Sequence, residues 1–146
     1  MNHRKTLLLA LDFGPHTETV LNETIAFADV LEATLHVIHV LALLDKRMSR
    51  NTYAYFNRSK QAQLAAAGAR CRAHRRLGSL LLHEGDPASQ ILLAADALAA
   101  DMIVMGARAR RPARRIEHGS VIETVLRKAA CTVVIVRNQV AVHDDN

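Results

Sequence analysis

Five short apolar runs alternate with four longer segments of helical character along this chain of 146 residues. The runs extend from Thr6 to Leu11, Thr34 to Val40, Ser79 to His83, Met102 to Met105 and Thr132 to Val136. Their lengths suit strands, and the continuous apolar run that follows Thr6 is typical of a strand that is buried on both faces. Regular alternation of strand and helix predicts a parallel sheet with right-handed crossovers and helices on both faces. The alternation therefore limits the chain to a doubly wound α/β fold.

The four helical segments show different signals. Apolar positions recur at helical spacing from Thr17 to Leu31, whereas the segment from Tyr53 to about Arg76 is rich in Ala, Gln and Arg. Asp86 followed by Pro87 is a strong start for a third helix, which we expect to end near Ala99. The fourth helix is predicted to begin after Gly119 and Ser120, with Ser120 and Glu123 as a capping box, and to end near Lys128.

The length suits one domain, which we assign to residues 1–137. Residues 138–146 carry little apolar character and are expected to form a flexible tail. Within the domain we expect five strands in the order 3-2-1-4-5, with four helices on two faces of the sheet. Ligands of such sheets bind beyond the carboxyl ends of the strands, where the strand order reverses. This position brings Asp12 beside Met105 and Gly106, with His39 and Val40 forming one wall.

A formal charge of +5 and a pI near 9.8 favour anionic partners, either nucleotides or nucleic acids. The chain has no Trp, two Tyr and three Phe, so few rings are available for stacking on bases, and nucleic acid is the less favoured partner. Cys71 and Cys131 form no CxxC pair, which favours a reducing cytoplasm. No uncharged apolar stretch approaches 18 residues, so we expect no membrane span.

The stretch from Asp101 to Arg137 carries the clearest sign of a ligand site. A helix that begins at Ser120 presents unpaired backbone N–H groups and the positive end of its dipole, which together favour an anion. Gly106 and Gly119 bound the preceding loop and would let the backbone approach a ligand closely. The loop also contains the arginines Arg108, Arg110, Arg111, Arg114 and Arg115. The same residues also fit a simpler interpretation, in which Gly106 ends a strand, Ser120 caps a helix and the arginines are solvated.

These features together resemble the universal stress protein family. The resemblance covers essentially the whole chain: a first strand followed by Asp12, a second that ends in His39 and Val40, and the segments GDPA, DMIVMG and GSVIETVLRKAACTVVIVR. The ATP-binding members of the family carry Gly, two residues, Gly, nine residues, Gly and then Ser or Thr. The corresponding positions here are Gly106, Ala109, Gly119 and Ser120. Both spacings are kept, and Ala109 replaces the second glycine.

The resemblance implies that ATP is the bound cofactor, with adenine near Val40 and Met105 and with Asp12 at the base or ribose. It places the phosphates along Gly106 to Ala109 and at Gly119, Ser120 and Val121, with Mg²⁺ held largely by the phosphates. Ala109 is strained if that position requires positive φ and is tolerated if it requires only a small residue.

No catalytic set is visible in the sequence, so any ATP hydrolysis is expected to be slow and the nucleotide to act as a bound signal. The resemblance also implies a homodimer formed through the last strand, Thr132 to Val136. Three interpretations follow. The first is an ATP-binding regulatory protein of the stress-response type. The second is a dimeric interaction protein of the same fold without nucleotide, and the third is a nucleic-acid-binding module that uses the arginine loop.

Overall fold

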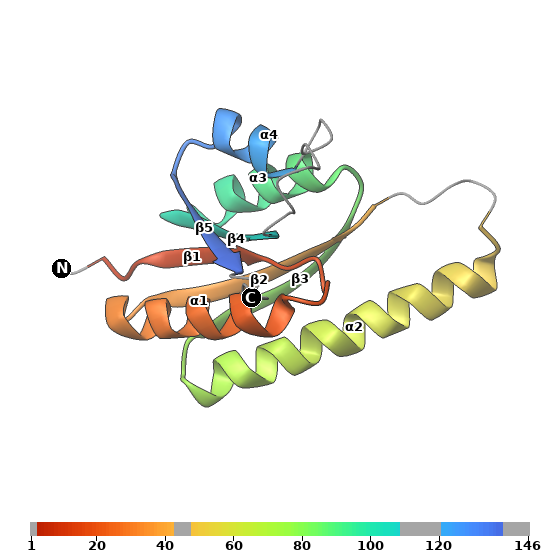
Figure 1. Cartoon of the computed structure of the whole chain (residues 1–146), viewed down its shortest axis with the longest axis horizontal. Helices are drawn as coiled ribbons and strands as arrows, with labels where there is room; N and C mark the ends of the chain where they lie inside the picture. The colour runs from red at the N-terminus through yellow and green to blue at the C-terminus, as the bar shows by residue number, and fades with distance from the viewer. Residues whose placement is uncertain (1–2, 43–47, 109–120, 139–146) are drawn as a thin grey trace, which may run out of the picture.

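The computed structural model of the chain describes residues 3–42, 48–108 and 121–138. In these residues strands and helices alternate, as Figure 1 shows. The strands are β1 (Thr6–Ala10), β2 (Thr34–Leu41), β3 (Leu77–Glu84), β4 (Met102–Arg108) and β5 (Thr132–Asn138). The helices are α1 (Thr17–Leu31), α2 (Arg50–Ala73), α3 (Pro87–Ala97) and α4 (Val121–Lys128).

The five strands form one parallel sheet in the order β3-β2-β1-β4-β5. This order confirms the predicted fold. In the central strand, Leu8 lies opposite His36 of β2 and Ile103 of β4. The strand order reverses between β1 and β4, so the carboxyl ends of these two strands diverge into different connections and leave room between them.

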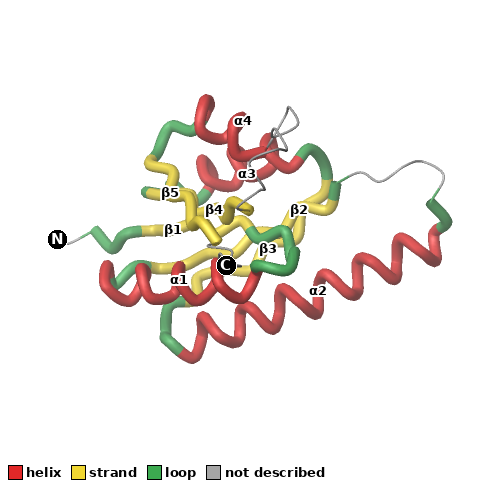
Figure 2. Tube along the Cα trace, in the orientation of Figure 1, coloured by secondary structure: helices red, strands yellow, loops and turns green. Residues whose placement is uncertain are grey.

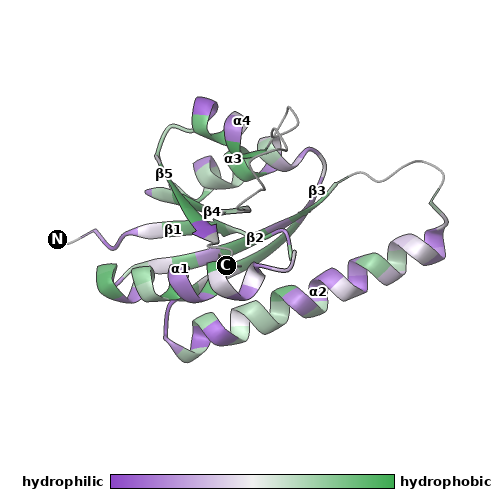
Figure 3. Ribbon diagram, viewed as in Figure 1, coloured by the Kyte–Doolittle hydropathy of each residue, from purple (hydrophilic) through white to green (hydrophobic). Residues whose placement is uncertain are grey.

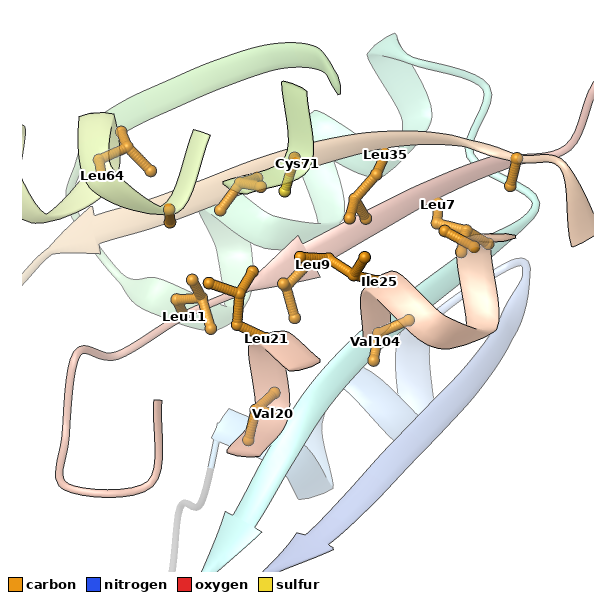
Figure 4. Close-up of a cluster of buried hydrophobic side chains, with 14 residues drawn as sticks. Leu7, Leu9, Leu11, Val20, Leu21, Ile25, Leu35, Leu64, Cys71 and Val104 are labelled. Carbon is orange, nitrogen blue, oxygen red and sulfur yellow. The ribbon is translucent and has the colours of Figure 1, made fainter. Parts of the chain in front are cut away.

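Helices α1 and α2 cover one face of the sheet, and α3 and α4 cover the other (Figure 2). Leu7 and Leu9 point into the core beneath α1 and α2, which Figure 4 shows, whereas Leu8 points into the core beneath α3 and α4. All three side chains are 0% exposed. Burial on both faces is therefore the reason that the first apolar run shows no alternation with polar residues.

Among the helices whose preceding residues the structure describes, α2 and α3 begin at side-chain caps. The Asp86 carboxylate accepts a hydrogen bond from the Ser89 N–H at 3.0 Å, and Pro87 occupies the first turn of α3, as predicted. Ser49 caps α2 by accepting a hydrogen bond from the Thr52 N–H at 3.2 Å. Because this cap was not recognised in the sequence, the predicted start of the helix at Tyr53 was three residues late.

Strand β4 is longer than predicted. The apolar run was expected to end at Met105, with a loop from Gly106, but Gly106 pairs with Val136 and the ladder continues to Arg108 opposite Asn138. Hydrogen bonding to β5 extends the strand beyond its apolar residues. Strand β5 includes Asn138, and the rest of the expected tail, residues 139–146, lies outside the described residues.

Candidate functional site

A cavity of about 390 Å³ opens at the carboxyl ends of β1 and β4. Six parts of the fold contribute to its lining: the end of β1 and its loop, the start of α1, the end of β2, the start of α3, the end of β4 and the start of α4. The lining residues are Ala10, Leu11, Asp12, Gly14, His16, Thr17, Val20, Ile38, His39, Val40, Pro87, Ile91, Met105, Gly106, Ala107, Val121 and Ile122. This size lies within the range of small-molecule sites in proteins.

Five of the eight residues predicted for the site lie together around this cavity, namely Asp12, Val40, Met105, Gly106 and Val121. They come from the loop after β1 and from β2, β4 and α4, segments that are far apart in the sequence. The other three, Ala109, Gly119 and Ser120, lie outside the described residues, as do the loop arginines from Arg110 to Arg115.

Apolar side chains dominate the cavity wall on the side of α3 and α4. Ile38, Val40 and Met105 belong to the core on this face, and Pro87 and Ile91 of α3 join them at the cavity. Sequence reasoning missed Pro87, Ile91 and Ile122 as lining residues. The GDPA segment marked the start of α3, but only the strand order places that start against the switch point. Such a wall suits a flat, weakly polar ring rather than a highly charged group.

Asp12 shapes the loop at the floor of the cavity. Its Oδ1 atom accepts a hydrogen bond from the Gly14 N–H at 2.8 Å, and the Thr17 hydroxyl donates to the Gly14 carbonyl at 2.8 Å. The first contact is an Asx turn, the structural role that is the alternative to ligand binding for an Asp at this position. The Asp12 carboxylate therefore lies at the cavity in an orientation that the loop itself maintains.

Phe13 adopts the left-handed region with φ of 56°, an uncommon conformation for a bulky residue. Its ring centroid lies 4.8 Å from that of His39, and the Lys60 ammonium lies 5.7 Å from the same Phe13 centroid. The ring is therefore in contact with side chains from both β2 and α2. Backbone strain of this kind costs on the order of 1–3 kcal/mol and persists only where neighbouring groups over-determine it.

His39 joins the end of β2 to the same loop. Its Nδ1 atom lies 2.6 Å from the Leu11 carbonyl oxygen, and because a carbonyl only accepts, Nδ1 carries the proton. Burial lowers the pKa of His39 below its ordinary value, so the ring is neutral at pH 7. The neutral ring thus ties β2 to the loop that carries Asp12 without adding charge to the cavity.

Gly106 has a packing role that its sequence context did not reveal. A Cβ atom added at this position would stand 2.5 Å from Val20 Cγ2, closer than real Cβ contacts approach. The missing side chain therefore lets α1 lie directly on β4. The space that a side chain at Gly106 would take is occupied by the protein's own core.

Helix α4 begins at the cavity, where Val121 and Ile122 both line it. The helix carries an acidic residue, Glu123, in its first turn, and its last turn carries Arg127 and Lys128, an arrangement that complements the helix dipole. The start of α4 therefore lies at the cavity, and the N-terminus of a helix is the end that favours an anion.

The remaining candidates for chemistry are separated from this site. His36 contacts the Ser79 hydroxyl at 2.6 Å on the opposite face of β2 from His39, as the spacing predicted. Burial raises the pKa of both the Cys71 and Cys131 thiols, which makes them poor nucleophiles. Among residues 3–42, 48–108 and 121–138, no group of three His, Cys, Asp or Glu side chains is arranged to hold a metal ion. Within the same residues, no helix is both long and apolar enough to cross a membrane.

Comparisons with known proteins agree with this architecture. The model of the universal stress protein family matches residues 3–137. A universal stress protein from Thermus aquaticus, encoded in the QAH/OAS sulfhydrylase 3′ region, is 31% identical over 135 residues, which cover 91% of this chain and 98% of the relative.

Two solved structures show the same fold. A protein of the universal stress protein family from Burkholderia pseudomallei superposes with a TM-score of 0.73 and 26% identity, covering 90% of this chain and 95% of its own. The universal stress protein from Archaeoglobus fulgidus, solved in complex with dAMP, has a TM-score of 0.64 and 23% identity over 92% of this chain and 98% of its own.

Proposed function

This chain belongs to the universal stress protein family, and we propose that it binds ATP at the carboxyl ends of β1 and β4 and uses the nucleotide as a regulatory signal. The observation that carries the proposal is the cavity at the switch point, which gathers Asp12, Val40, Met105, Gly106 and Val121. A relative of the same fold was solved with dAMP, an adenine nucleotide, which supports the class of ligand.

Each part of the cavity suits one part of the nucleotide. The apolar wall of Val40 and Met105 would hold the adenine ring, and Asp12 lies where a carboxylate can accept a hydrogen bond from the ribose or the base. The phosphates would extend along the end of β4 toward the start of α4, because the N-terminus of a helix favours anions. Gly119, Ser120 and Ala109 are assigned to the same phosphate region by the family motif.

Mg²⁺ would be held mainly by the phosphates of the nucleotide. Among the described residues that line the cavity, Asp12 is the one carboxylate, and one carboxylate together with phosphates is a common way of binding this ion. Its chemistry would be to neutralise phosphate charge. Asp12 orients the ligand, and the apolar wall excludes water from the ring.

We also propose a cytoplasmic homodimer of one α/β domain, residues 1–137, followed by a flexible tail. β5 lies at one edge of the sheet and exposes unpaired backbone groups along its outer side. Its β-branched residues from Thr132 to Val136 suit pairing with the β5 strand of a second copy. The two free thiols, Cys71 and Cys131, suit a reducing compartment.

Calorimetric titration of nucleotide-stripped protein with ATP and Mg²⁺ tests the proposal. We expect micromolar binding that is lost in Ala10→Leu, which fills the cavity from β1, and in Gly119→Val, which alters the phosphate region. Ala100→Leu is the matched control, because Ala100 packs against the same core but lies before β4, away from the cavity. Absence of heat up to millimolar ATP contradicts the proposal and favours the dimeric interaction protein.

The replacement at Ala109 has its own test. If that position needs positive φ, Ala109→Gly strengthens ATP binding severalfold because the strain of alanine is removed. Unchanged affinity shows that only a small side chain is required there.

A further inference from the structure

Helix α2 carries an unbalanced positive charge. Its 24 residues include Arg50, Arg58, Lys60, Arg70 and Arg72 but neither Asp nor Glu. The absence of acidic residues extends along the sequence from Lys46 to His83. Charged, solvated helices usually carry residues of both signs. Because α2 carries only positive ones, its charges add to a positive potential along the helix.

The two halves of α2 differ in their surroundings. In the C-terminal half, Leu64, Ala67 and Cys71 are buried against the sheet, and Arg70 pairs with Glu18 of α1. The N-terminal half projects beyond the sheet (Figure 1), and none of the residues from Arg50 to Gln63 is buried. Within the part of the chain that the structure describes, Arg50 and Arg58 form no ion pair. The projecting half therefore keeps its charge available.

Three of the five aromatic residues of the chain lie within one turn of this projecting half: Tyr53, Tyr55 and Phe56. The side chain of Tyr55 is 69% exposed and that of Phe56 is 39% exposed. Their rings meet edge to face with centroids 5.9 Å apart. The whole chain has few aromatic residues, which makes nucleic acid the less favoured partner on composition alone. The segment from Tyr53 to Phe56, by contrast, is rich in them.

The distribution of polar and apolar residues on α2 distinguishes between anionic partners. Figure 3 shows hydrophilic and hydrophobic residues interspersed along the helix. A helix that inserts into an anionic membrane surface needs a continuous apolar face opposite its cations, and α2 has no such face. Exposed rings beside unpaired arginines, along one straight element, instead suit a linear polyanion whose bases are available for stacking.

We propose that the projecting half of α2 binds single-stranded nucleic acid. Arg50 and Arg58 contact the phosphates, and Tyr55, which lies about 60° around the helix from Arg58, stacks on a base. From Arg50 to Gln63 the helix is about 20 Å long at the usual rise per residue, enough to follow a few nucleotides of an extended strand. Lys60 lies over Phe13 beside the cavity and is assigned to that loop rather than to the strand.

Fluorescence anisotropy with labelled oligo(U) and oligo(dT) of about 20 nucleotides, at roughly 50 and 200 mM salt, tests this proposal. We expect binding at low salt that weakens on the order of tenfold at the higher concentration. The double variant Arg50→Glu/Arg58→Glu is expected to bind at least about tenfold more weakly, and Tyr55→Ser severalfold more weakly. Both substituted arginines are exposed on a helix, so the fold should persist, which circular dichroism would verify.

Arg4→Glu/Arg127→Glu is the matched control, because both residues are exposed, lie outside α2 and change the net charge equally. The proposal predicts near wild-type binding for this control. Equal loss in the two double variants, or no binding at low salt, would overturn it. So would a polyglutamate competitor that displaces the oligonucleotide as well as unlabelled oligo(U) does, because the surface would then suit an acidic protein. The same variants are also titrated with ATP. Unchanged ATP affinity would show that a loss of oligonucleotide binding does not arise from the cavity.

Discussion

The two ends of the sheet are built in opposite ways. At the amino end, the Thr6 N–H donates to the Asp101 carboxylate at 2.8 Å, and the Asp101 N–H donates to the Thr6 carbonyl at 2.8 Å. These reciprocal bonds join β1 to the segment before β4. At the carboxyl end, the same two strands separate around a cavity of about 390 Å³, and Phe13 adopts a left-handed conformation.

This difference shows where the fold holds its strands together and where it leaves space for a ligand. Bonds between residues far apart in sequence tie the amino end together. At the carboxyl end, the bonds from the Gly14 N–H to Asp12 and from the Thr17 hydroxyl to the Gly14 carbonyl are local and shape a loop, which His39 joins to β2. We therefore expect substitutions at the amino end to change stability alone. Substitutions at the carboxyl end should change ligand binding, except where the core reaches the cavity.

Gly106→Ala tests that exception and has the largest expected effect. The new methyl group would meet Val20, whose β-branched side chain cannot easily rotate away, so we expect a loss of about 1–3 kcal/mol in the free energy of unfolding. Urea denaturation measures the loss. The loss of stability caused by Gly106→Ala should be smaller in a chain that already carries Val20→Ala than in the wild-type chain. A Gly106→Ala variant as stable as the wild type would show that the contact with Val20 is not restrictive.

Asp101 and Asp12 form a matched pair at the two ends, because each accepts a backbone N–H at 2.8 Å. The bond of Asp101 is partly buried and spans 95 residues, whereas that of Asp12 is exposed and spans two. Asp101→Ala should cost about 1 kcal/mol of stability and leave ATP affinity unchanged. Asp12→Ala should cost only about a few tenths of a kcal/mol of stability but should weaken ATP binding. The reverse pattern would contradict the division between the ends.

The dependence of stability on pH in the acid range gives a further test of the amino end. The hydrogen bond from the Thr6 N–H lowers the pKa of Asp101 below its ordinary value of 3.8, although burial opposes this effect. Its contribution to stability is therefore present above pH 3.8 and is lost as pH falls through the lower folded value. Asp101→Asn keeps an acceptor and should flatten the loss of stability below about pH 4. If Asp101→Asn loses stability in acid as the wild type does, as measured by urea denaturation at each pH, the loss comes instead from Asp29 and Asp86, whose pKa values are also lowered.

His39 at the carboxyl end should produce the smallest effect, near pH 6. Burial lowers its pKa below the ordinary value of 6.5, so on acidification the unfolded chain takes up a proton before the folded chain does. Stability is therefore greatest above pH 6.5 and falls as pH decreases toward the folded value. His39→Asn should remove part of that slope. The part of the slope that remains is assigned to His36, whose pKa is also lowered by burial and which this variant leaves in place. A slope unchanged in His39→Asn would contradict the neutral, buried state of this ring.

Local signals were sufficient for much of the fold. The bounds of α1 and the start of α3 at Pro87 follow from helical spacing and from the Asp86 cap, and both agree with the structure. The strand order is one of the common orders of doubly wound sheets and does not follow from local signals. Once it is given, the meeting of Asp12 with Met105 follows from the rule for ligand sites in such sheets. The strand ends were less accurate, since β1 stops at Ala10 while β3 runs from Leu77 to Glu84. Pairing with neighbours sets these limits, and it is not local.

Two features of the site could not be predicted because they depend on contacts between distant segments. Gly106 faces Val20 only once α1 lies on β4. The conformation of Phe13 depends on His39 and Lys60, which come from other elements. The start of α2, away from the site, was missed for a local reason: Ser49 caps the helix in a region without the apolar periodicity that marks most helices.

The most direct test of the division between the ends is the backbone amide NMR spectrum of the protein during titration with ATP and Mg²⁺. We expect the largest shifts at residues that line the cavity, namely Asp12, Gly14, Val40, Met105, Gly106 and Val121, while Thr6 and Asp101 at the amino end shift little. Larger shifts at the amino end or along α2 than around the cavity, or no shifts at millimolar ATP, would contradict it.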